Sequence, residues 1–489
     1  MHQALLIPEV LLGIFAHVNE HTDLVLTANS RRSLASLAKT CNSFHEPAMD
    51  LLWANIDDLE KLLGCVTRLH PMIYCSDARP GSLWSSEGVE PLSEHEACQF
   101  LRHAARVRSI DISYDDHFHL LTVLPTETCM FPRLMSLLWE IEAPESRYLH
   151  LFLSRTLRDC RLSAPHPALT TIGTHCAFLD YLKISDFDEV TADDLSLLSS
   201  AVRSCTRLKF LGCPPLEWAA WNHLSTLPTL LNLQIYSGSW PFEQPNLKFA
   251  PFLNITLLTF YVHIAEYAIT AMQFSEFPSL TCFEMSIHVL SWAEAEQLFC
   301  ALLQCNARLT LEQIIISSRD PDDEDGSDNY LTVITQFLCF SQLRTLSLVF
   351  DNCAIYLDND LLLEAVSRWP YIHHMKLDDQ RLQPPVVTFR GLFAALRRCP
   401  HLETLQLHID AVNIDIDPET ESFQHTTLKS FHVGFSNVLV ADAEAVARII
   451  FCMLPCVDQV GYADSEEWDE VNKCLASFKS PACPLTPEL

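Results

Sequence analysis

The stretch "LRTLSL" (residues 343–348) decides the fold of this chain, because its spacing recurs along most of the sequence. An apolar anchor, Leu343, is followed by apolar residues three and five positions later. The same spacing appears in "LETLQL" (402–407) and "LKSFHV" (428–433). The alternation at the end of each copy predicts a short strand with one buried face.

Fourteen copies of this pattern follow one another from residue 107 onward. Their anchors are Val107, Leu134, Leu157, Leu179, Leu208, Leu230, Ile255, Leu280, Leu311, Leu343, Ile372, Leu402, Leu428 and Val457. Successive anchors lie 22 to 32 residues apart, whereas leucine-rich repeats have a usual period of about 20–29 residues. The chain therefore resembles an irregular leucine-rich-repeat protein.

Several segments between the copies have helical periodicity, at 191–205, 291–305, 361–369, 389–399 and 441–454. A strand–helix unit of this kind buries its apolar face only by stacking on its neighbours. We therefore predict an α/β fold: a curved solenoid with parallel strands on the concave side and helices on the convex side. The alternative is an α/β enzyme, but the chain has only 11 glycines and neither a G-x-G-x-x-G motif nor a P-loop.

The charge of the chain limits the classes of partner that it is expected to bind. With 62 acidic and 32 basic residues, the formal net charge is −30. A nucleic-acid backbone and an anionic membrane surface both select for Lys and Arg, so neither is expected as a partner. No apolar run reaches the roughly 18 residues of a membrane span, and no signal peptide is recognised. We expect an intracellular protein, cytoplasmic or nuclear.

The sequence matches none of the metal-site and catalytic motifs considered next. The 19 cysteines include no C-x-x-C pair, so buried thiols are expected rather than a metal site or disulfides. The stretch 318–329 is acidic, but an EF-hand register with Gly326 at position six places Pro321 first and Thr332 twelfth, where a carboxylate is needed. The acidic stretch 320–328 is therefore interpreted as a solvated or disordered insertion, and its role is left open. With no G-x-S-x-G or H-E-x-x-H motif either, we expect no metal, no cofactor and no catalytic residue.

The first 53 residues differ from the repeats. "LLIPEVLLGIFAHV" (5–18) and "SLASLAKTCNSFHEPAMDLLW" (33–53) both carry apolar residues at helical spacing. Pro8 suits the first turn of a helix, where its missing N–H is not needed. One interpretation is an amphipathic helical hairpin that caps the next domain.

This segment also resembles an F-box, in the form abundant in the F-box proteins of mushroom-forming fungi. The residues that carry the likeness are Ile7, Pro8, Glu9, Leu12, Ile14, Phe15, Val18, Leu34, Leu37, Ala38, Cys41, Phe44, Leu52 and Trp53. The resemblance implies docking on a Skp-type adaptor and, through it, on a cullin–RING ubiquitin ligase. The adaptor-binding residues that it implies are Ile7, Pro8, Leu12, Ile14, Phe15, Leu34, Leu37, Cys41, Phe44 and Trp53.

These patterns divide the chain into three parts. We expect an F-box over 1–58, a helical connection with a loop over 59–103, and irregular leucine-rich repeats over 104–489. Within them, 57–74 looks helical, 93–112 looks like a helix that runs into a strand, and 465–478 looks like a terminal helix that caps the repeats.

The outward positions of the strands predict a surface for the target. Side chains before, between and after the last two apolar positions of each copy point away from the core. The candidate target-binding residues are Tyr181, Phe210, Tyr236, Tyr261, His374, Lys376, Gln406, His408 and His432. Aromatic and polar mixtures are favoured in recognition surfaces. The alternative is a solvated sheet face without a partner.

Taken with the resemblance, these features lead us to expect a substrate-recognition subunit of a Skp–cullin–F-box ligase. Its repeats would hold an unidentified target protein. The alternative is a ligase-independent interaction or inhibitor protein, since an acidic, cysteine-rich solenoid is also similar to the ribonuclease inhibitor.

Overall fold

The structure of the protein is a computed structural model. It describes residues 7, 10, 11, 13–15, 28–74, 84–113, 117–125, 129–141, 145–185, 191–236, 248–318, 330, 331, 333–350, 354–379, 385–417, 421, 423–463 and 465–479. The chain forms two compact units, Met1–Leu230 and Leu231–Leu489. We call them unit 1 and unit 2 and describe each by itself.

Unit 1 contains parallel strands that pair in chain order. They are β1 (Asn55–Ile56), β2 (Ser109–Ile112), β3 (Ser136–Trp139), β4 (Asp159–Leu162), β5 (Tyr181–Ile184) and β6 (Phe210–Cys213). Equivalent residues face each other across each pair, as Ser109 does with Ser136 and Ser136 does with Asp159. β1 lies within the segment expected to be an F-box.

The helices of unit 1 begin with α2 (Ala28–Ala38) and α3 (Asn42–Leu52), and residues 10, 11 and 13–15 are also helical. The others are α4 (Glu60–Leu63), α5 (His70–Tyr74), α6 (Glu94–Ala104), α7 (Ile172–His175), α8 (Ala192–Ser204) and α9 (Trp218–Ser225). Short 3₁₀ turns lie at Phe118–Leu121, Glu145–Leu151 and Pro167–Thr171.

Unit 2 repeats the same arrangement. They are β7 (Asn232–Tyr236), β8 (Leu257–Val262), β9 (Cys282–Ile287), β10 (Gln313–Ser318), β12 (Thr345–Phe350), β14 (His374–Asp379), β15 (Thr404–Gln406), β16 (Ser430–His432) and β17 (Val460–Gly461). All the pairs in this series are parallel. A separate parallel pair joins β11 (Tyr330–Leu331) and β13 (Ala354–Ile355).

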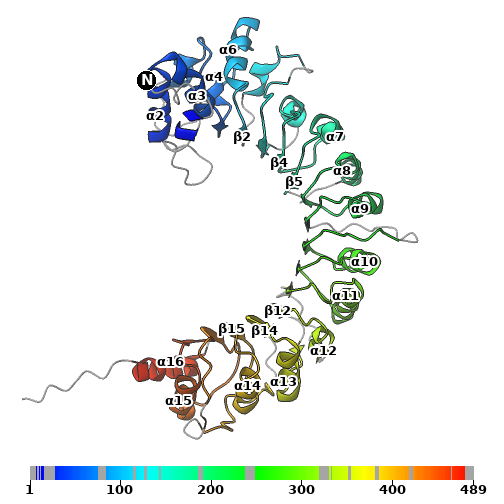
Figure 1. Ribbon diagram of the computed structural model, residues 1–489, viewed down its shortest axis with the longest axis vertical. Coiled ribbons are helices and arrows are strands. Elements are labelled where there is room, and N and C mark those ends of the chain that lie inside the picture. Colours follow the sequence, from blue (N-terminus) through cyan, green and yellow to red (C-terminus); the bar gives the residue numbers. More distant parts are fainter. Residues whose placement is uncertain are drawn as a thin grey trace, which may run out of the picture. The chain divides into compact units, whose positions relative to one another are not determined.

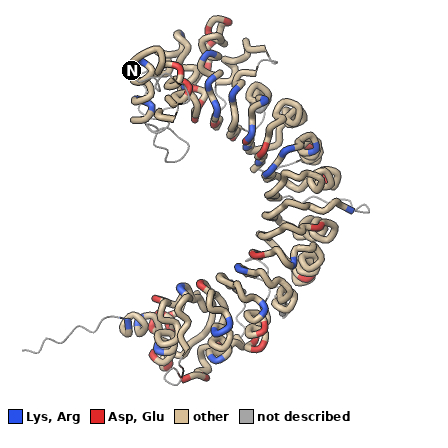
Figure 2. The backbone as a smooth tube through the Cα atoms, in the orientation of Figure 1, with Lys and Arg blue, Asp and Glu red and all other residues tan. Residues whose placement is uncertain are grey.

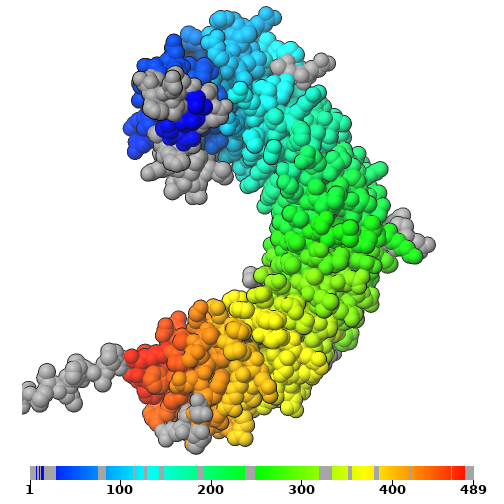
Figure 3. All heavy atoms as spheres, viewed as in Figure 1, coloured from blue at the N-terminus to red at the C-terminus, as the bar shows by residue number. Residues whose placement is uncertain are grey.

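The helices of unit 2 are α10 (Glu266–Phe274), α11 (Trp292–Gln304), α12 (Ile334–Phe337), α13 (Asn359–Arg368), α14 (Phe389–Leu396), α15 (Ala443–Met453) and α16 (Glu466–Lys479), with a 3₁₀ turn at Val440–Asp442. Within each unit the strands lie along one side and most of the helices along the other (Figure 1). The sheet face opposite the helices is called the open face below. Successive repeats pack without a gap within each unit (Figure 3).

The repeat pattern marks every strand from β2 onward except β11 and β13. Each of these strands begins two residues after its anchor, apart from β17, which begins three residues after Val457. None of the fourteen anchors is more than 2% exposed. The prediction of a parallel α/β repeat architecture is therefore confirmed.

A buried side chain fills the turn between helix and strand in several repeats. Cys205, Phe340, Trp369 and Cys399 each precede an anchor by three positions, and none is more than 4% exposed. Cys205 and Trp369 directly follow α8 and α13. These side chains fix the distance between helix end and strand start by close packing.

The segment 57–74, which we expected to be helical, is helical only in part. It forms the two short helices α4 and α5, with turns between them. A continuous helix would separate Gly64 from Tyr74 by about 15 Å. Instead, a Cβ placed on Gly64 would lie 2.4 Å from the ring of Tyr74. The chain folds back so that this ring packs on the bare glycine backbone.

Glu96 joins the start of α6 to the preceding turns. Its carboxylate accepts from Ser93 N at 2.8 Å, which completes a capping box, and from Arg68 Nε at 2.7 Å. The hydrogen bond from Arg68, with the bonds from Ser93, lowers the pKa of Glu96 from 4.5 to about 2. Because the folded-state pKa is depressed, the stabilisation is present above pH 4.5 and disappears as the pH falls towards 2.

Glu96→Gln should therefore lower the free energy of unfolding at neutral pH by about 1–2 kcal/mol, an estimate reduced because Arg68 is partly exposed. The difference from the wild type should shrink as the pH falls below 4.5. Urea unfolding at a series of pH values measures it. Glu94→Gln, an exposed position in the same helical turn, is the control. A difference that stays constant with pH would show that the carboxylate charge is not the cause.

Candidate functional site

The N-terminal helical segment has a small core of its own. Leu11, Phe15, Leu34, Ala38 and Ala48 form one buried cluster. Leu37, Phe44, Met49, Leu51 and Leu52 pack against it in partly buried positions. The rings of Phe15 and Phe44 meet edge to face with centroids 5.4 Å apart. Among the residues expected to bind an adaptor, Phe15 and Leu34 are thus buried inside the segment.

A second set of apolar residues in this segment faces outward. Ile7, Val10 and Ile14 are 47%, 38% and 43% exposed. Val10 N and Leu11 N both donate to Ile7 O at 3.1 Å, so Ile7 stands at the start of the helical turn. Spacings of three and four residues place the three side chains on one helix face. We call Ile7, Val10 and Ile14 the exposed apolar row.

The other residues of the F-box-like pattern have different positions. Pro8 and Leu12 lie outside the described residues. Cys41 is the N-cap residue of α3 and is half-buried. Trp53 is half-buried, and its ring lies 4.8 Å from that of His103 in α6. Trp53 therefore connects the helical segment to the first repeat.

An ion-pair network also holds α3 against the repeats. Arg106 pairs with Glu46 at 2.6 Å and with Asp50, and Arg133 reaches Asp50 at 3.2 Å. Arg106 and Arg133 each precede an anchor by one residue. Sequence analysis missed these pairs because their members are 56 to 83 residues apart and no local pattern connects them.

On the open face of unit 1, two of the predicted target-binding aromatics form a pair. Tyr181 and Phe210 are neighbours across β5 and β6 and stack with centroids 4.1 Å apart and an interplanar angle of 5°. The guanidinium of Arg161 lies 5.0 Å from the centre of the Tyr181 ring. These contacts present a flat aromatic surface with one cation beside it.

The open face of unit 2 contains the second aromatic pair. Tyr236 and Tyr261 are neighbours across β7 and β8, with centroids 5.8 Å apart and rings inclined by 7°. The hydroxyl of Tyr261 donates to Glu284 Oε1 at 3.3 Å. Burial, together with this contact with the carboxylate, raises the pKa of Tyr261 above its usual value.

The predicted histidine and lysine patch surrounds an acidic residue. Lys376 and Gln406 are lateral neighbours, as are Gln406 and His432. Asp378 lies among them, with its carboxylate 3.9 Å from Lys376 Nζ and 3.8 Å from His408 Nε2. Burial acts to raise the pKa of Asp378, but His408 and Lys376 outweigh it and leave the pKa below its usual value. The patch therefore carries less positive charge than its sequence indicates.

The two later histidines of the patch pack on glycines of the neighbouring repeats. A Cβ placed on Gly434, whose φ is +56°, would lie 2.2 Å from His408 Nε2. A Cβ on Gly461 would lie 2.3 Å from His432 Cδ2. Burial lowers the pKa of His432, so its ring becomes charged only at a more acidic pH than usual. His374, in contrast, is exposed.

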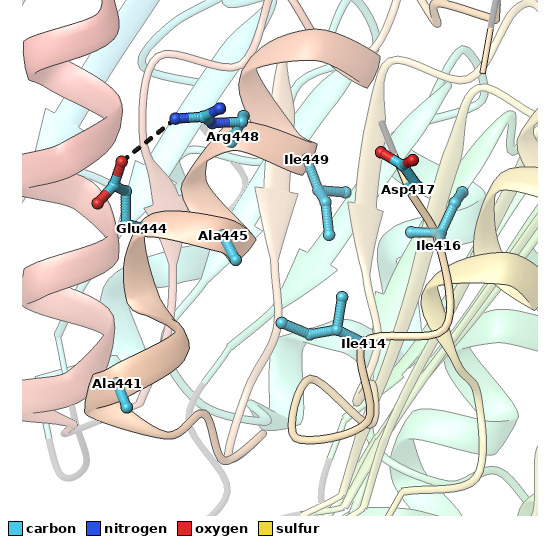
Figure 4. A pocket seen from close by; sticks show the side chains of 8 residues that line it. All are labelled: Ile414, Ile416, Asp417, Ala441, Glu444, Ala445, Arg448 and Ile449. Carbon is cyan, nitrogen blue, oxygen red and sulfur yellow. Dashed lines mark hydrogen bonds and ion pairs between the residues drawn. The ribbon is translucent and has the colours of Figure 1, made fainter. Parts of the chain in front are cut away.

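Unit 2 also has a pocket of about 450 Å³ on its helical side, between α15 and the preceding loop. Figure 4 shows Ala445 and Ile449 of α15 across the pocket from Ile414 and Ile416. Glu444 and Arg448 form an ion pair at 3.3 Å at its rim. None of the residues predicted to bind an adaptor or a target lines it.

Two further pockets lie in unit 1, of about 460 and 360 Å³, and both are lined by Arg108 and Met135. The larger one lies over β1 to β4 and also contains Arg31, Asp57, Asp159 and Arg161. Two of its arginines are paired with acidic residues, Arg31 with Asp57 at 3.7 Å and Arg161 with Asp159 at 3.0 Å. The sequence analysis had not proposed either pocket.

Within the described part of the chain, no three His, Cys, Asp or Glu side chains are placed to hold a metal ion. No helix there combines the length and apolar character needed to cross a bilayer. The acidic stretch 320–328 lies outside the described residues. No protein-family model matches the chain, and a comparison with curated proteins found no significant match.

Proposed function

We propose that this chain is a substrate-recognition subunit of a Skp–cullin–F-box ubiquitin ligase. In this role the N-terminal segment docks on a Skp-type adaptor and the repeats hold a target protein near the ligase. The role requires no catalytic group on this chain, because proximity supplies the effect. The observation that carries the proposal is the exposed apolar row, which lies on a segment whose sequence resembles an F-box.

The physical argument rests on how the apolar side chains are divided. Leu11, Phe15 and Leu34 are buried and hold the segment together. Ile7, Val10 and Ile14 remain 38–47% exposed although they lie on one face. Full burial of one such side chain contributes about 1.5–3 kcal/mol. An amphipathic helix with this kind of uncovered stripe is typical of surfaces that dock in a groove of a partner.

The test compares the full chain with the double variant Ile7→Asp with Ile14→Asp. We expect the wild type to bind a purified Skp-type adaptor and the variant to bind at least about 100-fold more weakly, because two apolar anchors are lost. Titration calorimetry measures both affinities. The thermal unfolding of the variant should match the wild type, since both positions are exposed.

Leu309→Asp is the matched control, because Leu309 is a 77% exposed apolar residue in unit 2. It should leave adaptor binding unchanged. If the wild type does not bind the adaptor, the proposal is wrong and a ligase-independent interaction or inhibitor protein becomes the better explanation. If the double variant binds like the wild type, the exposed apolar row is not the docking surface.

A further inference from the structure

The smaller pocket of unit 1 differs from the rest of this acidic chain in its lining. It measures about 360 Å³ and is lined by Arg108, Arg133, Met135, Thr156, Arg158 and Phe178. Three of these six residues are arginines and none is acidic, on a chain of net charge −30. Lys and Arg recur along the strand side of unit 1 (Figure 2). We call this pocket the arginine groove.

The repeat geometry places the lining residues in two rows. Arg108, Met135 and Arg158 each follow an anchor directly, whereas Arg133, Thr156 and Phe178 each precede one. The backbone holds the first row together, because Met135 N donates to Arg108 O at 2.7 Å and Arg158 N donates to Met135 O at 2.9 Å. Neighbouring parallel strands are about 4.8 Å apart. The two arginines therefore flank Met135 on a rigid base.

The groove has an uncovered apolar floor. Met135 is 41% and Phe178 is 49% exposed. The guanidinium of Arg207 lies 5.3 Å from the centre of the Phe178 ring on the side of the next repeat. A thioether and an aromatic ring together form a surface suited to a large apolar side chain.

Two of the arginines that line the groove have no acidic partner. Arg133 is paired with Asp50 at 3.2 Å. The side chains of Arg108 and Arg158 make no ion pair or hydrogen bond with the described residues. Arg108 is half-buried. The larger pocket beside the groove differs because acidic residues also line it, namely Asp57, Asp111 and Asp159, and two of its arginines are paired.

We propose that the arginine groove binds an acidic peptide segment that has one large apolar side chain between carboxylates. The apolar side chain lies over Met135 and Phe178, and the carboxylates pair with Arg108 and Arg158. The planar guanidinium group holds a carboxylate through two parallel hydrogen bonds, which favours arginine over lysine at such a site. A short peptide contacts only the groove, whereas a longer polyanion would meet the negative surface of the rest of the chain.

This inference goes beyond the proposed function. The groove lies at the edge where the strands begin and not among the outward strand positions expected to bind the target. Recognition of the peptide does not involve the exposed apolar row. The test therefore uses the full chain without an adaptor, and failure of adaptor binding would leave its result unaffected.

The experiment measures fluorescence anisotropy of a short labelled peptide in which one Phe is flanked on both sides by Asp and Glu. A second peptide carries Asn and Gln in place of the acids, a third carries Ser in place of Phe, and a fourth carries phosphoserine in place of the acids. We expect the first peptide to bind more tightly than the second and third, and its affinity to fall as salt is added.

The decisive variant is Arg108→Gln with Arg158→Gln. Because two hydrogen-bonded charge contacts are lost, the affinity for the first peptide should fall by about 100-fold. Arg203→Gln is the matched control, because Arg203 is exposed on α8 in the same unit and no ion pair holds it within the described chain. It should leave the affinity unchanged.

Several outcomes would overturn the inference. Equal binding of the first and second peptides would exclude recognition of the carboxylates, and equal binding of the first and third would exclude the apolar floor. Binding of the phosphoserine peptide alone would mean that the groove is a phosphate site. Equal weakening by Arg203→Gln would show an effect of overall charge rather than of the groove.

Discussion

Replacing Trp369 by alanine should lower the free energy of unfolding of the surrounding repeats by about 4 kcal/mol. The indole is fully buried at the end of α13, three residues before the anchor Ile372. Its Nε1 donates to Phe337 O in α12 at 3.1 Å, so one side chain joins two successive repeats. The alanine variant leaves both a cavity and a buried carbonyl without its donor, and the second loss costs about 1–3 kcal/mol if no water replaces it.

Hydrogen exchange read by mass spectrometry localises this effect. The amides of β12 and β14 should lose protection first, because those strands lie on either side of the missing contact. Tyr371→Ala is the control, since Tyr371 is 47% exposed two residues away, and it should change stability by no more than about 0.5 kcal/mol. Similar losses for the two variants would mean that Trp369 does not join the repeats.

Leu34→Asp should unfold the N-terminal helices and leave the strands of unit 1 folded. Leu34 is fully buried at the centre of the cluster formed with Leu11, Phe15, Ala38 and Ala48. A carboxylate there has no partner, and burial of a polar group without a hydrogen bond costs about 2–7 kcal/mol. The cluster is small, so this cost exceeds what it contributes. Limited proteolysis should cut the variant within α2 and α3.

The control for this variant is Ser33→Asp, one residue earlier and exposed on the same helix. It adds the same charge to α2 without entering the cluster, so protease resistance should be retained. Resistance of Leu34→Asp equal to that of the wild type would show that the cluster does not hold the segment together. Loss of protection in β2 and β3 as well would show that the segment and the repeats unfold as one.

The strands of the repeats were predictable from sequence because one short spacing carries the information. An anchor with apolar residues three and five positions later determines both where a strand begins and which face is buried. The pattern does not predict β1. Trp53 and Ile56 have the spacing of three residues, but Asp58 stands five residues after Trp53, where the pattern needs an apolar residue. The break between α4 and α5 was not predictable from local sequence either, because it depends on contact between the ring of Tyr74 and Gly64.

The candidate sites were only partly predictable, for a related reason. Ile14 and Phe15 are neighbours with similar side chains, yet one is 43% and the other 2% exposed. Periodicity shows that both lie on a helix, but only the positions of α2 and α3 decide which face is covered. The arginine groove is not predicted by the outward strand positions, because its lining residues lie directly before and after the anchors. Alignment of the copies on their anchors would have placed Arg108 and Arg158 at equivalent positions on either side of Met135.

Buried thiols near the ends of helices make several repeats reporters of their own opening. Burial raises the pKa of Cys205 and of Cys399 to about 12. At pH 8 only roughly one molecule in ten thousand then carries the reactive thiolate at either position. An alkylating reagent reaches these sulfurs only when the local repeat opens, whereas Cys98 and Cys300 are exposed and react directly. Labelling rates resolved by cysteine would therefore map the order in which neighbouring repeats separate.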